Sequence, residues 1–479
     1  MTQLIRGTQL VRLLGAWQSH GPDYVALADT VRALLTDGRL ALGVRLPAER
    51  ELAETLGISR TTVSAAYAEL RTSGHLTSRR GAGSWTTVPG GTRMAYSGLW
   101  SAPDSAPDLL DMATAALAAP AEMMEATAEA MAVFPRYLSG AGYHPTGILD
   151  LRAVIAEMYE ARGLPTAPDQ IMVTNGVQHA LDLAVRLLVP PASAVVTESP
   201  TYPNALATFA SRRARISTYG VGAGGWDEDL LLTTIKQAGA RIAYLIPEFH
   251  NPTGHLMPED LRAKLPAAAH AAGTDLVIDE SFVDLNLSET PMPPPIAHWD
   301  RHARVLTIGG MSKPYWGGLR IGWIRATEPV VQRLAAARVG VDMAGPVLDQ
   351  LVSVALLRRA DQIVGARRVQ LREQRDALVS AVRAKLPNWH FTVPEGGVTL
   401  WAELDGPVSS GLVRAAESFG VRLAPGPRFG VDGTLERFLR LPFTMPVPEL
   451  LEAVDRIVAA THEISRGTRR TWDTPALVA

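Results

Sequence analysis

Lys313 lies in the segment GGMSKPYWGGLRIGW (residues 309–323) and is one of only four lysines among 479 residues. Nearly every other basic residue of the chain is an arginine. A primary amine that loses its proton can form a Schiff base with an aldehyde, whereas a guanidinium group cannot. Lys313 could also be an ordinary surface lysine beside a loop rich in proline and glycine. Its neighbours in the sequence decide between these interpretations.

Polar residues follow several apolar runs at the points where strands would end. Asp279 ends the run DLVID, Asn251 follows IAYLIPEFH in a turn, and RVLTIGG leads to Lys313. Open α/β sheets bind ligands at the carboxyl ends of their strands, so we expect these residues to lie close together. The segment VTNGVQHALDLAVRLL passes from a strand through a glycine turn into a helix. Such a turn offers backbone N–H groups to a phosphate.

These segments match the requirements of pyridoxal 5'-phosphate (PLP). Its aldehyde needs a lysine, its pyridine nitrogen a carboxylate, its phenolic oxygen a donor, and its phosphate a helix N-terminus with a cation. Each segment alone has an ordinary explanation, since NPTG is a common turn and an aspartate after a strand often caps a helix. Their order and their position after strands favour a PLP site.

The first 85 residues have a different character. Pro47 and two glutamates open a helix that Gly57 ends, and Ser59 is a good N-cap for a second helix. Two short helices joined by a tight turn form a helix-turn-helix, and HLTSRRGAGSW predicts a two-stranded wing with a basic tip. An arginine at the exposed start of the second helix can contact guanine, and threonine hydroxyls can reach phosphate. An ordinary helical hairpin with a basic face is the alternative, which the wing disfavours.

The composition limits the function classes. Hydrophobic residues make up 47% of the chain, charged residues 20%, and the net charge is −2, so any nucleic-acid surface must be local. Cysteine is absent, which excludes disulfides and thiolate metal sites, and no metal is expected. No run is long enough to cross a bilayer and no signal peptide is evident, so we expect a cytoplasmic protein without membrane contact.

The chain divides at a stretch rich in Pro, Gly, Ser and Ala. We expect a DNA-binding domain over residues 1–88, a linker over 89–108 and a PLP-binding domain over 109–479. In the third part, apolar strand-like runs alternate with helical stretches. This alternation predicts an α/β fold with a mostly parallel central sheet.

The stretch LPAERELAETLGISRTTVSAAYAELRTSG closely resembles the winged helix-turn-helix of GntR-type transcription regulators, over about residues 24–88. The resemblance implies that double-stranded operator DNA is a partner. It places Arg50 and Arg60 at bases and Arg80 near the minor groove. The residues that we expect at the DNA are Arg50, Ser59, Arg60, Thr61, Thr62, Arg79 and Arg80.

Residues 110–465 resemble fold-type I, PLP-dependent aminotransferases, and the whole chain resembles MocR/GabR-type regulators. The resemblance makes Lys313 the Schiff-base lysine, Asp279 the partner of the pyridine nitrogen and Asn251 the donor to the phenolic oxygen. Tyr202 would stack on the ring, and Arg440 would hold the carboxylate of an effector. The implied phosphate contacts are Gly176, Val177, Gln178, Ser312 and Arg320, with Tyr137 reaching the phosphate of a second subunit in a homodimer.

Two residues depart from the family pattern. Phe282 stands where a tyrosine hydroxyl often meets the phenolic oxygen, and Val177 where a small hydroxyl residue is frequent. These losses leave cofactor binding plausible and weaken the case for efficient transamination, so no residue is assigned a catalytic role. We therefore expect a regulator that senses PLP or an amino compound. The alternatives are an active aminotransferase with an appended DNA-binding module and a DNA-binding scaffold whose large domain only dimerises.

Overall fold

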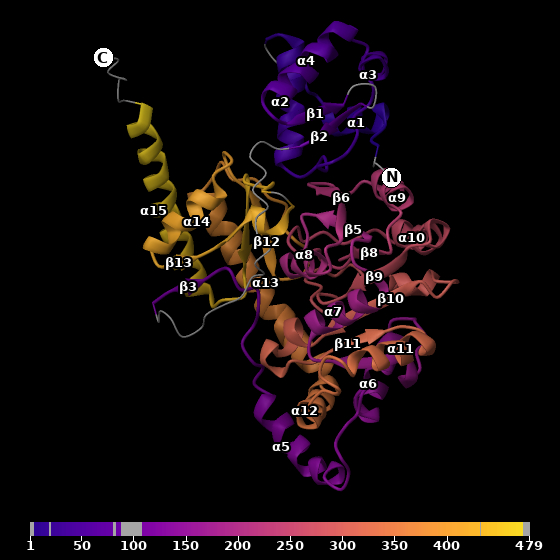
Figure 1. Cartoon of the computed structure of the whole chain (residues 1–479). Coiled ribbons are helices and arrows are strands. Elements are labelled where there is room, and N and C mark those ends of the chain that lie inside the picture. The colour runs from indigo at the N-terminus through magenta and orange to yellow at the C-terminus, as the bar shows by residue number, and fades with distance from the viewer. Residues whose placement is uncertain (1–3, 19–20, 80–82, 88–107, 432, 473–479) are drawn as a thin grey trace.

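The computed structural model describes residues 4–18, 21–79, 83–87, 108–431 and 433–472, and side chains only up to residue 464 (Figure 1). These residues form an N-terminal module, a unit around an eight-stranded sheet, and a C-terminal unit around a three-stranded sheet. The expected linker lies outside the described residues except for Asp108. Within the described ranges, no helix combines the length and the apolar character needed to span a membrane.

The N-terminal module is a winged helix, as predicted. Its elements are α1 (Gly7–Leu14), α2 (Asp23–Thr36), α3 (Glu49–Leu56), α4 (Arg60–Thr72), β1 (Leu76–Arg79) and β2 (Gly83–Thr86). β1 and β2 pair antiparallel and form the wing. Gly57 ends α3 with a φ of +68°, a conformation that glycine adopts without strain. Leu52, Val63 and Leu70 are among the buried side chains that join α3 and α4 to α2.

The large sheet has the order β4-β11-β10-β9-β8-β5-β6-β7. Its central pairs β10–β9, β9–β8, β8–β5 and β5–β6 are parallel, whereas β11 runs antiparallel to both of its neighbours, which confirms the prediction of a mostly parallel sheet. The strands are β4 (Ile171–Thr174), β5 (Ala194–Ser199), β6 (Arg215–Gly222), β7 (Gly225–Trp226), β8 (Ile242–Leu245), β9 (Asp275–Asp279), β10 (Val305–Gly310) and β11 (Gly322–Arg325).

Helices cover both faces of this sheet. Because its strands are buried on both sides, their sequences are nearly continuous apolar runs. Consecutive residues of β8 point to opposite faces of the sheet, since Ala243 belongs to the core cluster on one face and Tyr244 to the core cluster on the other. One face carries α7 (Val177–Leu188), α8 (Pro203–Ser211) and α11 (Glu328–Arg338). The other carries α6 (Leu149–Ala161), α9 (Glu228–Ala238), α10 (Glu259–Ala272) and α12 (Val347–Leu357), with α5 (Met123–Val133) packed on α12.

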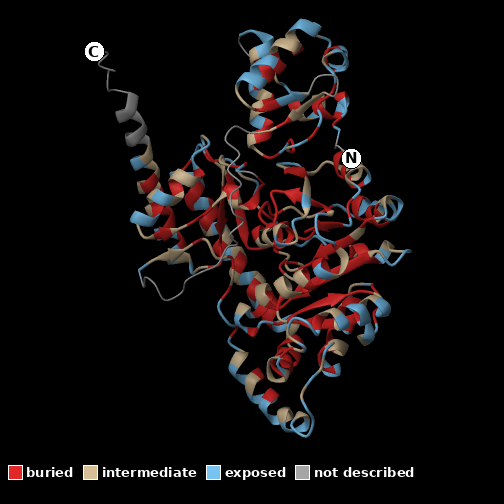
Figure 2. Cartoon of the chain, viewed as in Figure 1, coloured by how far each residue is buried: buried red, intermediate tan, exposed pale blue. Residues whose placement is uncertain are grey.

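The C-terminal unit packs three helices beside a small sheet (Figure 2 shows its buried interior). β12 (Thr399–Glu403) and β14 (Ala424–Pro425) flank β15 (Phe438–Pro442), and β13 (Val421–Arg422) pairs with β3 (Leu110–Asp111). Its helices are α13 (Ala360–Lys385), α14 (Ser409–Ser418) and α15 (Val447–Trp472). Short helical turns complete the chain: η1 (Phe134–Tyr137), η2 (Pro168–Gln170), η3 (Ile296–Trp299), η4 (Ser312–Trp316), η5 (Gly317–Leu319) and η6 (Gly426–Phe429).

Candidate functional site

α4 lies on the side of the winged helix away from the rest of the chain, and exposed arginines stand at its start and on α3 (Figure 1). Arg60 is the first residue of α4, and its side chain is 72% exposed with its Nε 3.9 Å from Glu49. Arg50 is 82% exposed and its Nε lies 3.0 Å from Glu54 on the same helix. Exposed ion pairs of this kind are weak. Both guanidinium groups can therefore exchange these partners for other anionic groups.

Three hydroxyl groups cluster at the N-terminus of α4. The Ser59 Oγ accepts from the Thr62 N–H at 3.1 Å, which confirms Ser59 as an N-cap. The same oxygen lies 2.8 Å from the hydroxyls of both Thr61 and Thr62. Arg79 is the last residue of β1, and Arg80 lies outside the described residues. The cap fixes the direction in which the first turn of α4 presents its side chains.

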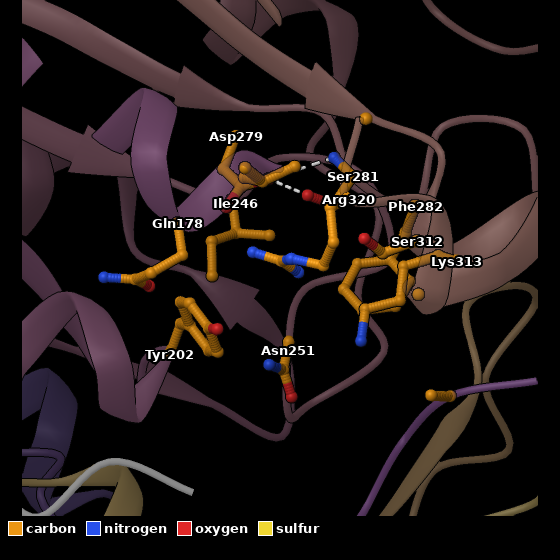
Figure 3. Close-up of a pocket in the computed structure, with 14 residues that line it drawn as sticks. Gln178, Tyr202, Ile246, Asn251, Asp279, Ser281, Phe282, Ser312, Lys313 and Arg320 are labelled. Atoms are coloured by element: carbon orange, nitrogen blue, oxygen red, sulfur yellow. Dashed lines mark hydrogen bonds between the residues drawn. The ribbon is translucent and has the colours of Figure 1, made fainter. Parts of the chain in front are cut away.

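A cavity of about 200 Å³ lies at the carboxyl end of the large sheet (Figure 3). Eight of the predicted cofactor residues line it: Lys313, Asp279, Asn251, Tyr202, Val177, Gln178, Ser312 and Arg320. Tyr202 and Lys313 lie on opposite sides of the cavity in Figure 3. Phe282, which departs from the family pattern, also lines it. Sequence reasoning missed the other lining residues: Ala116, Ile246, Ser281, Gly310 and Gly317. They are small or apolar, so nothing in the sequence distinguishes them from core or loop positions.

Lys313 lies in the π-helical turn η4 that follows β10. Its Nζ donates a hydrogen bond to the Ala115 carbonyl oxygen at 2.7 Å. Burial lowers the pKa of Lys313 to about 8, and the nearby positive charge of Arg440 acts in the same direction, against the opposing effect of Asp279. A neutral amine is therefore accessible close to neutral pH, as Schiff-base chemistry requires.

Asp279 ends β9 and is 4% exposed. Its Oδ2 accepts from the Tyr244 hydroxyl at 2.7 Å, and its Oδ1 accepts from the Ser281 hydroxyl at 2.5 Å and the Ser281 N–H at 3.0 Å. Burial raises the pKa of Asp279, and these hydrogen bonds oppose the rise. Tyr244 and Ser281 thus orient the carboxylate. Tyr244 stands inside an apolar strand run, which hides its role in the sequence.

The turn before α7 forms a tight cradle. Gly176 has a φ of +85° and precedes the first turn of α7, whose N–H groups have no partner within the helix. Arg320 donates from Nη2 to the Asn175 carbonyl oxygen at 2.9 Å, and a Cβ on Gly176 would lie 2.9 Å from that Nη2. A Cβ on Gly310 would lie 2.6 Å from Val177 Cγ2. Only glycine at these two positions lets the arginine and the helix start approach each other.

Arg440 is brought to the edge of the cavity and does not line it. It is 3% exposed, its guanidinium carbon lies 4.9 Å above the Phe429 ring, and its Nη1 lies 3.5 Å from Asn251 Oδ1. Its Nη2 also donates to the Ala113 carbonyl oxygen. Burial lowers the pKa of Arg440 to about 10. An arginine at this place can reach a carboxylate that enters beside Asn251.

Tyr137 is not brought to the cavity within one chain. It lies in η1, where its hydroxyl donates to Asp150 Oδ2 at 3.3 Å. Its predicted contact requires a second subunit and stays a prediction. Gly176 does not line the cavity itself but contacts Arg320, which does.

Comparison with known proteins identifies the family. The model of aminotransferases of class I and II matches residues 111–457, which is more than half of the chain. The chain belongs to this family. Residues 23–85 match the bacterial regulatory proteins of the gntR family, so the winged helix is a GntR domain joined to an aminotransferase domain.

Relatives with both parts and with only the second part are known. The HTH-type transcriptional regulator YisV of Bacillus subtilis is 28% identical over 81% of this chain and 86% of its own length. The probable rhizopine catabolism regulatory protein MocR of Rhizobium meliloti is 27% identical over 84% of this chain and 86% of its own. The 2-aminoadipate transaminase of Thermus thermophilus is 32% identical over 66% of this chain and 80% of its own.

Solved structures agree with the fold. The α-aminoadipate aminotransferase LysN of Thermus thermophilus, complexed with N-(5'-phosphopyridoxyl)-L-leucine, superposes with a TM-score of 0.69 at 29% identity, over 75% of this chain and 94% of its own. The multiple substrate aminotransferase of Thermococcus profundus has a TM-score of 0.69 at 27% identity, over 76% of this chain and 93% of its own. Aminotransferases of this class depend on PLP.

The residues around the cavity fit PLP. A lysine of lowered pKa, a buried carboxylate held by two hydroxyl groups, and an arginine at a helix N-terminus surround one space. The cradle at Gly176 would be filled by any Cβ, which suits a site that a phosphate must approach closely.

Proposed function

We propose that the chain is a transcription regulator that binds operator DNA through its GntR domain and senses PLP, or an amino compound together with PLP, in its aminotransferase domain. The observation that carries this proposal is the coexistence, in one chain, of an exposed arginine-bearing helix start and a cavity lined by eight of the predicted cofactor residues. The names of its relatives YisV and MocR support the regulatory half. The absence of a membrane-spanning helix among the described residues is in keeping with action at DNA in the cytoplasm.

Each part of the pocket has a proposed task. Bound PLP supplies an aldehyde for amines and an electron-withdrawing ring. Lys313 holds the aldehyde carbon, Asp279 holds the proton on the ring nitrogen, Asn251 donates to the phenolic oxygen, and Tyr202 covers one face of the ring. The phosphate contacts are the turn formed by Gly176, Val177 and Gln178, with Ser312 and Arg320. Arg440 binds the carboxylate of an effector with its fork of donors.

The DNA contacts form a second proposed set. Arg50 and Arg60 read base edges, because their guanidinium groups are exposed and only weakly paired. Ser59, Thr61 and Thr62 present hydroxyl groups to phosphates at the N-terminus of α4, where the helix dipole favours an anion. Arg79, at the end of β1, completes this set together with Arg80, which lies outside the described residues.

We further propose that the chain acts as a homodimer. Large apolar side chains are exposed on α5, in the segment after η1, at the start of α6, and again after α11. They are Met124, Met131, Leu138, Tyr143, Leu149, Val339 and Met343. Apolar surface of this extent favours a second copy. Tyr137 lies on this surface, in keeping with its predicted reach into the pocket of a partner.

A working aminotransferase is the second candidate, because the Thermus thermophilus relative is a 2-aminoadipate transaminase. Phe282 argues against it. This residue lines the pocket with its ring centroid 5.6 Å from Lys313 Nζ and offers no hydroxyl to the cofactor. The phenolic oxygen of bound PLP would therefore have one hydrogen-bond donor fewer, which should slow the repeated proton transfers through Lys313 that turnover requires. Binding of an amine requires only the first exchange.

The deciding experiment measures operator binding by the full-length protein with and without PLP, followed by a screen of amines. The sensor function predicts that PLP, or PLP with one amine, changes operator affinity by at least about fivefold, a coupling of about 1 kcal/mol. Amines should change the absorption of the bound cofactor without steady release of keto acid. Repeated turnover at about 1 s⁻¹ or faster, within the range of ordinary enzymes, would establish the aminotransferase instead.

A further inference from the structure

A second cavity, of about 390 Å³, lies where the winged helix meets the two other units. It shares no lining residue with the cofactor pocket. The winged helix contributes Asp37 and Arg39. The remaining lining residues are Pro200, Val221, Gly222, Ala223, Thr253, His255, His390, Phe391, Thr392, Trp401, Glu403, Leu435 and Phe438. We call this space the junction cavity.

The C-terminal end of α2 lies between the two larger units, beside this cavity. The Leu435 N–H of the C-terminal unit donates to the Thr36 carbonyl oxygen at 2.6 Å. Gly38, with a φ of +68°, leaves room for Ser199, because an added Cβ would lie 2.9 Å from the Ser199 Oγ. A Cβ on Gly220 would lie 2.7 Å from the Arg39 backbone. A molecule in the junction cavity therefore touches all three units at once.

Two carboxylates, Asp37 and Glu403, line the cavity, and one oxygen of Asp37 lacks a hydrogen bond within the described part of the chain. The Asp37 side chain is 14% exposed, and its Oδ1 has no hydrogen-bond partner among the described residues, since the Arg437 Nε lies 3.7 Å away. Burial raises the pKa of Asp37 to about 6, the arginines Arg437 and Arg39 oppose this rise, and the negative charge of Glu403 adds to it. Asp37 and Glu403 line the same cavity and repel each other, and a cation bound near both would offset this repulsion.

Aromatic rings form another wall of the junction cavity. Trp401 and Phe438 are stacked with their centroids 5.3 Å apart and their planes 2° from parallel, and Phe391 also lines the space. The faces of such rings attract organic cations, and the attraction is strongest where water is excluded. The remaining charged or titratable lining groups are Arg39, His255 and His390, and Arg437 donates one N–H to the Asp405 carbonyl oxygen.

We propose that the junction cavity is a second ligand site, for an organic cation that carries an ammonium group on an aromatic body, and that the bound cation holds the winged helix against the other two units. The ammonium group lies between Asp37 and Glu403, and the aromatic body lies against Trp401. The binding and the docking stand on the geometry alone. Only their consequence for transcription rests on the function proposed above.

The cavity and the cofactor pocket are close but distinct. Pro200 lines the junction cavity and Tyr202, two residues later, lines the cofactor pocket. Trp401 lies opposite Arg440 in the pairing of β12 with β15. A probe for the junction cavity must therefore be unable to react with an aldehyde. A quaternary ammonium ion meets this condition because its nitrogen has no lone pair.

The test is calorimetric titration of the full-length, PLP-loaded protein with benzyltrimethylammonium. We expect saturable binding with a dissociation constant below about 1 mM. Asp37→Asn and Glu403→Gln should each weaken binding at least about tenfold, as expected for loss of one charge partner. Asp29→Asn is the matched control, since Asp29 is an exposed aspartate in the middle of α2 that pairs with Arg32.

Hydrogen exchange of the Leu435 amide reports the docking itself, because this N–H is bonded across the boundary to Thr36. The probe should slow this exchange at least about fivefold in the wild type and in Asp29→Asn, and not in Asp37→Asn. Three results would each overturn the proposal. The first is no saturable binding up to 10 mM (about tenfold above the expected limit), and the second is binding by both carboxylate variants as tight as that of the wild type. The third is binding of the probe to the wild type without slower exchange of the Leu435 amide. If only the proposed regulatory function is wrong, the protein should fail to bind operator DNA, while the calorimetric and hydrogen-exchange results remain as expected.

Discussion

The two functional regions of this chain place their polar groups in opposite ways. On the winged helix, Arg50 and Arg60 are 82% and 72% exposed and pair only with neighbouring surface glutamates. In the cofactor pocket, Asp279 and Asn251 are 4% and 6% exposed and every oxygen of Asp279 has a hydrogen-bond partner. Duplex DNA is a large polyanion that is already ordered, so exposed cationic side chains are sufficient to bind it. A small cofactor needs groups that are already oriented before it binds.

This difference has an energetic consequence. Removing an exposed arginine costs the fold little, because surface ion pairs contribute about 0–1 kcal/mol. Removing a buried partner leaves another polar group without its hydrogen bond, which costs about 1–3 kcal/mol. Variants of the winged helix should therefore separate binding from stability, and variants of the pocket should affect both.

The largest expected effect is at Lys313. Lys313→Ala should abolish the visible absorption that the PLP-loaded protein shows, since no other amine lines the cavity among the described residues. Absorption spectra after incubation with excess PLP and gel filtration measure this effect. Lys236→Ala on α9 is the control and should keep the spectrum of the wild type. A coloured Lys313→Ala protein would refute the assignment of the lysine.

The next effect is at the DNA surface. Arg60→Ala should weaken specific operator binding by about 1–3 kcal/mol and relax the base preference at one position of each half-site. Its thermal midpoint should stay close to that of the wild type, because the guanidinium group is exposed. Thr62→Ala should weaken specific and random DNA about equally. Equal losses by Arg60→Ala on both DNA types would contradict a role in base reading.

A smaller effect is expected from Phe282→Tyr. The new hydroxyl would donate to the phenolic oxygen of bound PLP and favour its deprotonated form. One added hydrogen bond is worth about 1 kcal/mol, so the pH midpoint of the visible absorption should fall by somewhat less than one unit. A pH titration of the absorption measures it. Phe391→Tyr, in the junction cavity, is the control and should leave the midpoint in place.

The smallest effect concerns Asp37, at the joint between the two regions. Its pKa of about 6 lies above the usual value of an aspartate, so its contribution to stability is greatest in acid and falls as the pH rises toward 6. Arg437, Arg39 and Glu403 are the charged groups that act on it. Asp37→Asn removes the stability loss that ionisation of Asp37 causes. Above pH 6, the thermal midpoint of the variant should therefore exceed that of the wild type by up to a few degrees. Below about pH 4 the two proteins should unfold at the same temperature.

Much of this arrangement could be predicted from the sequence because its signals are local. Gly57 marks the end of α3 and Ser59 the start of α4. The apolar runs before Asp279 and Lys313 place the first residue at the end of a strand and the second just after one. The contacts of Tyr244 with Asp279 and of Thr36 with Leu435 join residues that are 35 and 399 positions apart. Such pairs depend on how whole units pack, and no periodicity in the sequence records them. The antiparallel insertion of β11 between β4 and β10 was hidden for the same reason.

The scarcity of lysine gives the chain an unusual chemical handle. Lys264 is bonded to Glu228 and Lys385 to Asp455, and the glutamate raises the pKa of Lys264, whereas burial lowers the pKa of Lys313 to about 8. At mildly alkaline pH, small amine-directed labelling reagents that enter the cavity should therefore modify Lys313 well before the other side-chain amines. Peptide mass spectrometry after a short pulse of such a reagent would count the fraction of unoccupied pockets, even in a crude extract and without any spectroscopic signal.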